Sequence, residues 1–211
     1  MQHATPSSDE VHVWLARLDG EEEPAVAALP LPERERAETF LRAEDGRHWA
    51  RSRLALRRVL SAYLGQEPRQ IEISLEENGK PRLAEAVGLE FNLSHSGELA
   101  LIVLSSPRPV GVDIEKVEPD RDLLPVAERA LDAAAAERVR AAAPGERAAV
   151  FYEAWVRHEA RLKCLGAGLT GPVPEAPVAV RTLDPGPGYA AAVAVAGAAF
   201  GRLLVRDLSP A

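Results

Sequence analysis

The segment Gly111-Val112-Asp113-Ile114-Glu115 places two acids two positions apart within an apolar run. Side chains of a β-strand alternate between its faces, so both carboxylates of such a strand point to the same side. Two neighbouring carboxylates repel each other unless a cation or a proton lies between them. Mg²⁺ accepts oxygen pairs of this kind, with water and substrate phosphates completing its coordination. The alternative is a half-buried strand with a solvated acidic face.

A second group of candidate residues lies between Phe151 and Lys163, where the apolar spacing predicts a helix. Phe151 and Trp155 belong to the stripe that faces the core, and Glu159 and Lys163 are neighbours on the adjacent stripe. Glu159 could supply a third carboxylate to a metal, and Lys163 a cation to a phosphate. The alternative is an ordinary ion pair on a helix surface.

A third group lies in the segment Asn92–Gly97 (NLSHSG), at the end of another predicted strand. Adjacent residues of a strand point to opposite faces, so Ser94 and His95 are not expected to form a nucleophilic pair. A hydroxyl and an imidazole beside a turn can hold a phosphate by hydrogen bonds. The alternative is a polar cap where the strand turns.

The composition is that of an ordinary globular protein. The chain has 211 residues, 46% hydrophobic and 27% charged, which suits one large domain or two small ones. Its net charge of −7 argues against general nucleic-acid binding. Cys164 is the single cysteine, so neither a disulfide framework nor a cysteine metal cage is expected. A polar N-terminus and the lack of a long apolar run predict a cytoplasmic protein without a membrane segment.

A local basic surface is predicted on this acidic chain. Its members are Arg34, Arg36, Arg42, Arg47, Arg51, Arg53, Arg57 and Arg58. Such a surface suits a compact anionic ligand or an acidic partner, and the alternative is a set of solvated helix faces.

The periodicity of the chain predicts an α+β fold in two halves. Helices are expected over 33–41, 47–64, 123–131, 133–143 and 147–165, with Asp132 as an N-cap. Strands are expected over 11–15, 71–75, 91–94, 99–104, 110–114, 178–183, 189–195 and 202–208, with a turn at 78–81. A boundary near 105–109 divides the chain into domains 1–106 and 107–211.

Taken in order, four segments of the chain resemble those of 4′-phosphopantetheinyl transferases of the surfactin-activating (Sfp) type. They are 78–81 (NGKP), 91–97 (FNLSHSG), 111–116 (GVDIEK) and 155–163, the last followed by GAGL at 166–169. Each segment alone is a weak signal, but four in order at suitable spacing are a strong one. The length also fits the larger, monomeric class of these enzymes.

The resemblance implies two similar α+β subdomains, a pseudo-dimer, with the active site in the cleft between them. It implies a monomeric, Mg²⁺-dependent enzyme that acts on coenzyme A and an apo acyl or peptidyl carrier protein. The 4′-phosphopantetheine group would move to a serine of the carrier, and adenosine 3′,5′-bisphosphate would be released. The identity of the carrier is left open.

The resemblance also implies roles for individual residues. Mg²⁺ would be bound by Asp113, Glu115 and Glu159, with Glu159 also acting as the base. Lys163 would contact the coenzyme A phosphates. Ser94 and His95 would hold the 3′-phosphate. Further candidates for binding coenzyme A are Lys80, Arg47, Arg51 and Arg53, and a further acid near the metal is Glu137.

The chain departs from the family at two positions. His158 stands where the family usually has lysine, and Cys164 where it often has glycine. A packed structural histidine explains His158 at least as well as a ligand does, and it neutralises phosphate less well near neutral pH. Two other functions remain open: a Mg²⁺-dependent nucleotide phosphodiesterase or pyrophosphatase, and a non-catalytic module that binds coenzyme A.

Overall fold

Strands and helices occur along the whole chain, of which the computed structural model describes residues 3–19, 27–76, 79–85, 88–167 and 174–208. The strands are β1 (Glu10–Arg17), β2 (Ile73–Leu75), β3 (Pro81–Leu83), β4 (Glu90–Ser96), β5 (Leu99–Ser105), β6 (Val110–Lys116), β7 (Val178–Leu183), β8 (Tyr189–Ala196) and β9 (Arg202–Leu208). The helices are α2 (Leu31–Glu38), α3 (Ala43–Leu64), α4 (Leu124–Ala130), α5 (Ala133–Ala141) and α6 (Arg147–Leu165), with a 3₁₀ turn η1 (Pro68–Gln70).

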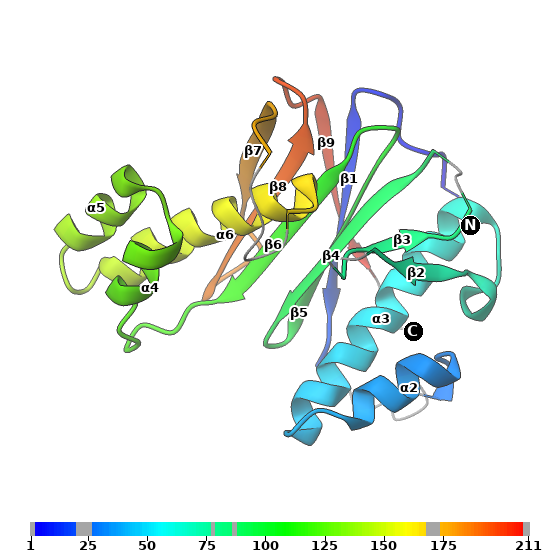
Figure 1. The fold of residues 1–211 in the computed structure, drawn as a ribbon. Coiled ribbons are helices and arrows are strands. Elements are labelled where there is room, and N and C mark those ends of the chain that lie inside the picture. The colour runs from blue at the N-terminus through cyan, green and yellow to red at the C-terminus, as the bar shows by residue number, and fades with distance from the viewer. Residues whose placement is uncertain (1–2, 20–26, 77–78, 86–87, 168–173, 209–211) are drawn as a thin grey trace.

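Two sheets form the centre of the molecule (Figure 1). A four-stranded sheet has the order β4-β5-β1-β9, a three-stranded sheet has the order β6-β8-β7, and β2 and β3 form a separate hairpin. Helix α3 covers the outer face of the first sheet, where Leu56 and Ile102 belong to one buried cluster. Helix α6 covers the outer face of the second sheet, where Ala160 and Ala192 belong to another.

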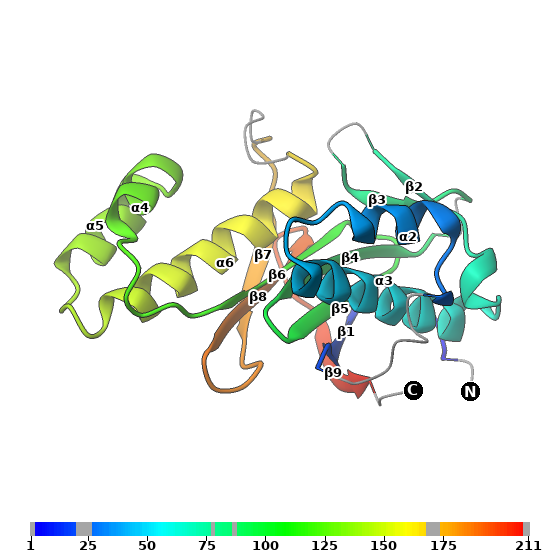
Figure 2. The same ribbon diagram turned by 90° about the horizontal axis from the view of Figure 1, so that it is seen from below.

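The inner faces of the two sheets share an apolar core. Val13 and Leu101 of the first sheet lie in one buried cluster with Val112 and Val193 of the second. Because side chains alternate along a strand, Val112 points into this core while its neighbour Asp113 points toward α6. The layers therefore run helix, sheet, sheet, helix, and α4 and α5 lie beyond the end of α6 that is farther from the first sheet (Figure 2).

The last strand, β9, belongs to the first sheet. It pairs in parallel with β1, so that Val13 lies opposite Val205. This pairing crosses the boundary predicted between residues 106 and 107, and the two halves share a sheet. The mixed α and β content that the sequence predicts is confirmed, whereas the pseudo-dimer arrangement stays a prediction.

Helix ends follow the local sequence signals. The Asp132 carboxylate accepts a hydrogen bond of 2.8 Å from the amide of Ala135, which confirms it as the N-cap of α5. Gly65 and Gly166 end α3 and α6 in the left-handed conformation, with φ of 68° and 65°. No helix in the described part of the chain is long and apolar enough to cross a membrane.

Several elements differ from the sequence-based expectations, among them helix α2, which ends at Glu38 and not at 41. Helix α3 begins at Ala43, ahead of the expected start at 47. The strand expected over 71–75 begins only at Ile73, and Ile71 is instead buried in the cluster that α3 forms with the first sheet. The turn expected at 78–81 leads directly into β3, which starts at Pro81. Position 78 lies outside the described residues, as do 168 and 169.

Candidate active site

Helix α6 lies directly on the backbone of β6 at Gly111. A Cβ atom at this position would overlap the carbonyl oxygen of Ala160 and the backbone nitrogen of Cys164. A residue without a side chain is therefore required for this approach. The contact brings α6, with Glu159 and Lys163, to the face of β6 that carries the acids.

An ion pair between Lys163 and Asp113 joins the helix to the strand. The Lys163 Nζ atom lies 2.7 Å from Asp113 Oδ1 and 3.0 Å from Ser94 Oγ. Ser94 Oγ in turn donates to Asp113 Oδ1 at 2.9 Å. Burial raises the pKa of Asp113, and Lys163 and Ser94 act against this rise. Lys163 therefore pairs with Asp113 of β6 and not with its helix neighbour Glu159. None of the ion pairs between described residues includes Glu159.

Two further carboxyl groups, Glu115 and Glu159, share this environment. Burial and repulsion by Asp113 raise the pKa of Glu159 to about 7. The same two causes raise the pKa of Glu115, and Lys163 lowers both values. Asp113 and Glu115 lie on the face of β6 against which α6 packs, and Glu159 lies one helical turn before Lys163, the partner of Asp113. The structure therefore brings together the three acids and the lysine that the sequence predicts.

The carboxylates of the site retain oxygens that no described group satisfies. Asp113 Oδ2 and Glu159 Oε1 are buried and have no hydrogen-bond partner among the described residues. Buried polar atoms are normally paired, so these two oxygens are candidate ligands for a hard cation. In the described part of the chain, no three His, Cys, Asp or Glu side chains are arranged as a ready-made metal site. The cation that pairs with Asp113 in this structure is the ammonium group of Lys163.

Strand β4 presents Ser94 and His95 on opposite faces, as predicted for adjacent strand residues. The Ser94 hydroxyl is bonded to Asp113, whereas the imidazole of His95 lies under the influence of His48 at the start of α3. Burial lowers the pKa of His95, and the positive charges of Lys163 and His48 lower it further. The two side chains of the Ser-His pair therefore do not converge on one point.

Other residues predicted to bind coenzyme A lie in different surroundings. Lys80 Nζ donates to the carbonyl oxygen of Val110 at 3.2 Å, next to the start of β6. Arg51 Nη1 donates to the carbonyl oxygen of Leu18 at 2.6 Å. The side chain of Arg47, in the first turns of α3, is exposed.

Arg53 and Arg57 depart from the predicted basic surface. Both are buried, and both pair with the carboxylate of Glu33, at 2.6 Å and 2.7 Å respectively. A buried guanidinium needs such a partner, and Glu33 on α2 provides one for each arginine. These two arginines therefore tie α2 to α3, which corrects their assignment to the basic surface.

A cavity of about 290 Å³ adjoins Glu115. Phe151, Tyr152 and Trp155 of α6 form part of its lining, together with Leu123 ahead of α4. The indole of Trp155 also lowers the pKa of the Glu115 carboxyl. The carboxyl group of Glu115 thus lies at a cavity whose lining includes aromatic side chains of α6.

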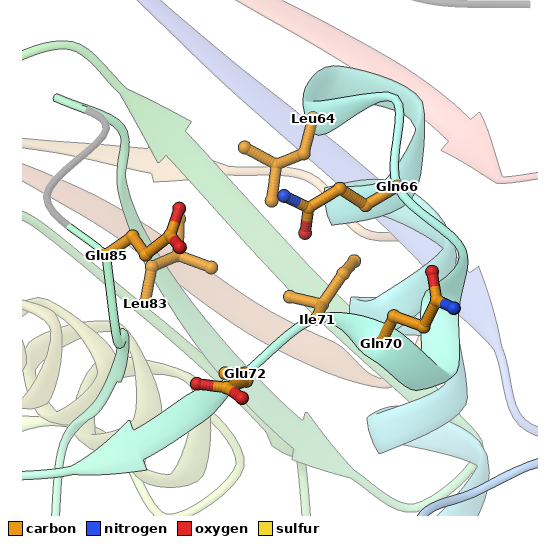
Figure 3. A pocket seen from close by; sticks show the side chains of 7 residues that line it. All are labelled: Leu64, Gln66, Gln70, Ile71, Glu72, Leu83 and Glu85. Carbon is orange, nitrogen blue, oxygen red and sulfur yellow. The ribbon is translucent and has the colours of Figure 1, made fainter.

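A separate cavity of about 370 Å³ lies between the end of α3 and the β2–β3 hairpin. Leu64 and Gln66 line it on one side and Leu83 and Glu85 on the other (Figure 3). It contains none of the residues predicted for the site.

Three residues that the sequence analysis singled out do not contact the acids of the site. The ring of His158 lies 6.3 Å from that of Trp155, which supports a packed histidine. Glu137 is exposed on α5 and pairs with Arg140. Cys164 is buried, and burial raises the pKa of its thiol to about 11, so it is no nucleophile near neutral pH.

Sequence reasoning missed Asn92, Ser96 and Gly111. Ser96 Oγ donates to Glu115 Oε2 at 3.0 Å, and Asn92 Oδ1 accepts from the amide of Val112 at 3.1 Å. Polar residues at every second position of β4 indicated that its inner face contacts polar groups. No local pattern in the sequence indicated that these groups belong to the edge strand β6.

Comparisons with known proteins identify the family of this chain. The family model "4′-phosphopantetheinyl transferase, N-terminal" matches residues 13–107, and the model of the 4′-phosphopantetheinyl transferase superfamily matches residues 109–192. The chain is similar to 4′-phosphopantetheinyl transferase HetI of Nostoc sp., with 38% identity over 77% of this chain and 71% of the relative.

Two other relatives carry the same enzyme name. Similarity to 4′-phosphopantetheinyl transferase Sfp of Bacillus subtilis is 28% identity over 85% of this chain and 88% of the relative. Similarity to 4′-phosphopantetheinyl transferase AcpT of Escherichia coli is 35% identity over 67% of this chain and 68% of the relative. The chain belongs to the 4′-phosphopantetheinyl transferase superfamily and is an enzyme of this class.

Proposed function

We propose that this chain transfers the 4′-phosphopantetheine group of coenzyme A to a serine of an apo acyl or peptidyl carrier protein. The serine oxygen attacks the β-phosphorus, the bond from that phosphorus to the bridging oxygen breaks, and adenosine 3′,5′-bisphosphate leaves. The single observation that carries the proposal is the meeting of Asp113, Glu115, Glu159 and Lys163 where α6 lies on β6.

We propose that Mg²⁺ is held by Asp113, Glu115 and Glu159. The unpaired Asp113 Oδ2 and Glu159 Oε1 atoms support this assignment, since an all-oxygen donor set suits this ion. When bound, Mg²⁺ supplies positive charge to the diphosphate and stabilises the leaving group. Without a cation or protons, the buried acids would repel a diphosphate substrate.

Glu159 is the proposed base for the carrier serine. A base works best when its pKa lies near the working pH, and burial together with Asp113 brings the pKa of Glu159 to about 7. Among the ion pairs between described residues none includes Glu159, so no neighbouring cation keeps its carboxylate from receiving a proton. The serine proton thus passes to Glu159 as the new oxygen–phosphorus bond forms.

Lys163 and His95 are the proposed contacts for coenzyme A phosphates. Lys163 Nζ already binds an anion, Asp113, and the Lys163 side chain is 30% exposed, so a phosphate can reach it. His95 lies on the face of β4 nearer α3, and Lys163 is the charged group with the largest effect on its pKa. Because the Ser94 hydroxyl is bonded to Asp113, His95 rather than Ser94 is assigned to the 3′-phosphate.

The proposal is tested with an apo carrier protein, coenzyme A and Mg²⁺. Mass spectrometry of the carrier should show the gain of one phosphopantetheine, and the nucleotide product should be adenosine 3′,5′-bisphosphate. A carrier whose acceptor serine is replaced by alanine should gain nothing. Release of nucleotide with no change in the mass of any carrier would refute transfer and favour a phosphodiesterase.

Glu159→Gln provides the matched variant for this test. It keeps the size of the side chain and removes its charge, so transfer should nearly cease while the fold persists. Glu153→Gln, on an exposed position of the same helix, is the control and should retain the full rate.

A further inference from the structure

The strands β4 and β6 meet through side chains. Each is the edge strand of its own sheet. An edge strand leaves a row of backbone N–H groups unpaired, and such groups need partners when they are buried. The inner face of β4 supplies those partners at alternate positions, from Asn92, Ser94 and Ser96.

Three contacts repeat along this junction at steps of two residues on both strands. The amide of Val112 donates to Asn92 Oδ1 at 3.1 Å. The amide of Ile114 donates to Ser94 Oγ at 3.4 Å, and that of Lys116 donates to Ser96 Oγ at 3.0 Å. We call Asn92, Ser94 and Ser96 the β4 polar ladder.

The two serines of the ladder do more than accept these hydrogen bonds. Each hydroxyl has one proton, and since its oxygen accepts from an amide, the proton is free to be donated elsewhere. Ser94 Oγ donates to Asp113 Oδ1 at 2.9 Å, and Ser96 Oγ donates to Glu115 Oε2 at 3.0 Å. Each serine thus binds one residue of β6 through its carboxylate and the next through its amide.

These contacts fix the orientation of the acids. A hydrogen bond to one oxygen of a carboxylate leaves the other oxygen to point elsewhere, and Asp113 Oδ2 has no partner among the described residues. Ligand groups held by such outer contacts bind metals more tightly, because their geometry is set before the metal arrives. Asn92 serves as an internal comparison, since the residue that precedes its amide partner is Gly111, which has no carboxylate.

We infer that Ser94 and Ser96 are positioning residues of the reaction, which hold Asp113 and Glu115 in the orientation that a divalent cation requires. The inference rests on the proposed function, because the cation in question is the one proposed there. It gives a role to Ser96, although Ser96 is far from Glu159 and Lys163 in the sequence.

Ser96→Ala is the principal test, since Ser96 is only partly buried and its hydroxyl has no contact with Lys163. The variant should raise the half-saturating Mg²⁺ concentration by roughly 10- to 100-fold. This is measured without coenzyme A, as the MgCl₂-dependent rise in Tm, and again in the transfer assay. Ser96→Thr keeps the hydroxyl and should restore the Mg²⁺ dependence of the unchanged protein.

Two further variants separate positioning from packing. Ser94→Ala should weaken Mg²⁺ binding in the same way through Asp113, and it carries the test if Ser96→Ala does not fold. Ser105→Ala removes a buried hydroxyl that donates to the carbonyl oxygen of Arg108, at the far end of β5. It should lower Tm while leaving the Mg²⁺ dependence unchanged.

The outcomes distinguish the inference from the proposed function. If the unchanged protein responds to Mg²⁺ and both alanine variants of the ladder respond at the same concentrations, the positioning role is wrong and the proposed function stands. If the unchanged protein neither responds to Mg²⁺ nor modifies a carrier, the proposed function fails and the inference fails with it. A weaker Mg²⁺ response in Ser96→Ala that Ser96→Thr reverses supports the inference.

Discussion

The ammonium group of Lys163 lies 2.7 Å from Asp113 Oδ1, where it brings positive charge to a cluster of buried acids. The pair joins α6 to β6, and it therefore has two effects. It lowers the repulsion among Asp113, Glu115 and Glu159, and it occupies an oxygen that a metal could use. Lys163 is thus both a partner of the acids and a competitor of any divalent cation that they bind.

Replacing Lys163 by methionine should weaken the metal-free protein and strengthen its response to Mg²⁺. The variant keeps most of the apolar stem but leaves the Asp113 carboxylate with one donor fewer. Loss of a hydrogen bond to a charged group costs about 2 kcal/mol of unfolding free energy. With the competing charge removed, Mg²⁺ should bind at lower concentration, as measured by calorimetry without coenzyme A.

Transfer by Lys163→Met should nevertheless fall, because the proposed phosphate contact is lost. Arg157→Ala, at an exposed position of the same helix, is the control for general effects of charge removal from α6. A variant that binds Mg²⁺ no better than the unchanged protein would show that Lys163 does not compete for Asp113.

The contribution of Glu159 to the stability of the metal-free protein should decrease as pH rises from about 4.5 to about 7. The pKa of Glu159 is raised from 4.5 to about 7 in the folded chain, so the folded state keeps a proton that the unfolded state loses in this window. Unfolding then releases a proton. The contribution of Glu159 to the free energy of unfolding, on the order of 3 kcal/mol, is therefore lost with increasing pH. The raised pKa values of Asp113 and Glu115 act in the same direction.

Urea denaturation at pH 5 and pH 8, with a chelator present, measures this effect. Glu159→Gln should make the decline shallower, because the group that titrates is gone. Mg²⁺ should stabilise the protein more at pH 8, where the acids are ionised, than at pH 5. Equal pH dependence of stability in Glu159→Gln and the unchanged protein would mean that Glu159 does not titrate in this range.

His95→Ala should raise the KM for coenzyme A several-fold and leave the KM for 3′-dephospho-coenzyme A nearly unchanged. The prediction follows from the place of His95 on the α3 face of β4, away from the acids that Ser94 contacts. Steady-state kinetics with both substrates measures it. Equal changes for the two substrates would remove the 3′-phosphate from the role of His95.

Local patterns identified most of the elements of this fold, because helix and strand periodicity depend on neighbouring residues. The strands around Leu101 and Val112 and the long helix that ends at Leu165 are clear in the sequence. The parallel pairing of β9 with β1 is not, since it joins the two ends of the chain. Strand β3 was missed because its first residue, Pro81, had been assigned to the turn expected at 78–81.

The site was predictable to the extent that spacing alone determines it. An acid at every second position predicted that Asp113 and Glu115 share a face, and helical spacing placed Glu159 beside Lys163. The partner of Lys163 was not predictable, because the contact of α6 with β6 depends on a missing side chain at Gly111. The buried pairing of Arg53 with Glu33 was hidden for a similar reason, since a guanidinium on a helix is exposed more often than not.

Gly111→Ala should separate the acids from the helix. The added Cβ would overlap the backbone of α6 at Ala160 and Cys164, and backbone atoms cannot rotate away, so the helix must shift. Overpacking of this kind costs about 1–3 kcal/mol of unfolding free energy. The shift also moves Glu159 and Lys163 relative to Asp113, so transfer should fall at temperatures where the variant is still fully folded.

Gly145→Ala is the matched control, because a Cβ at Gly145 meets no atom within 4 Å and its φ is not positive. Urea denaturation and the transfer assay, applied to both variants, should show losses for Gly111→Ala alone; a rate and stability equal to those of the unchanged protein would mean that α6 does not need close contact with β6.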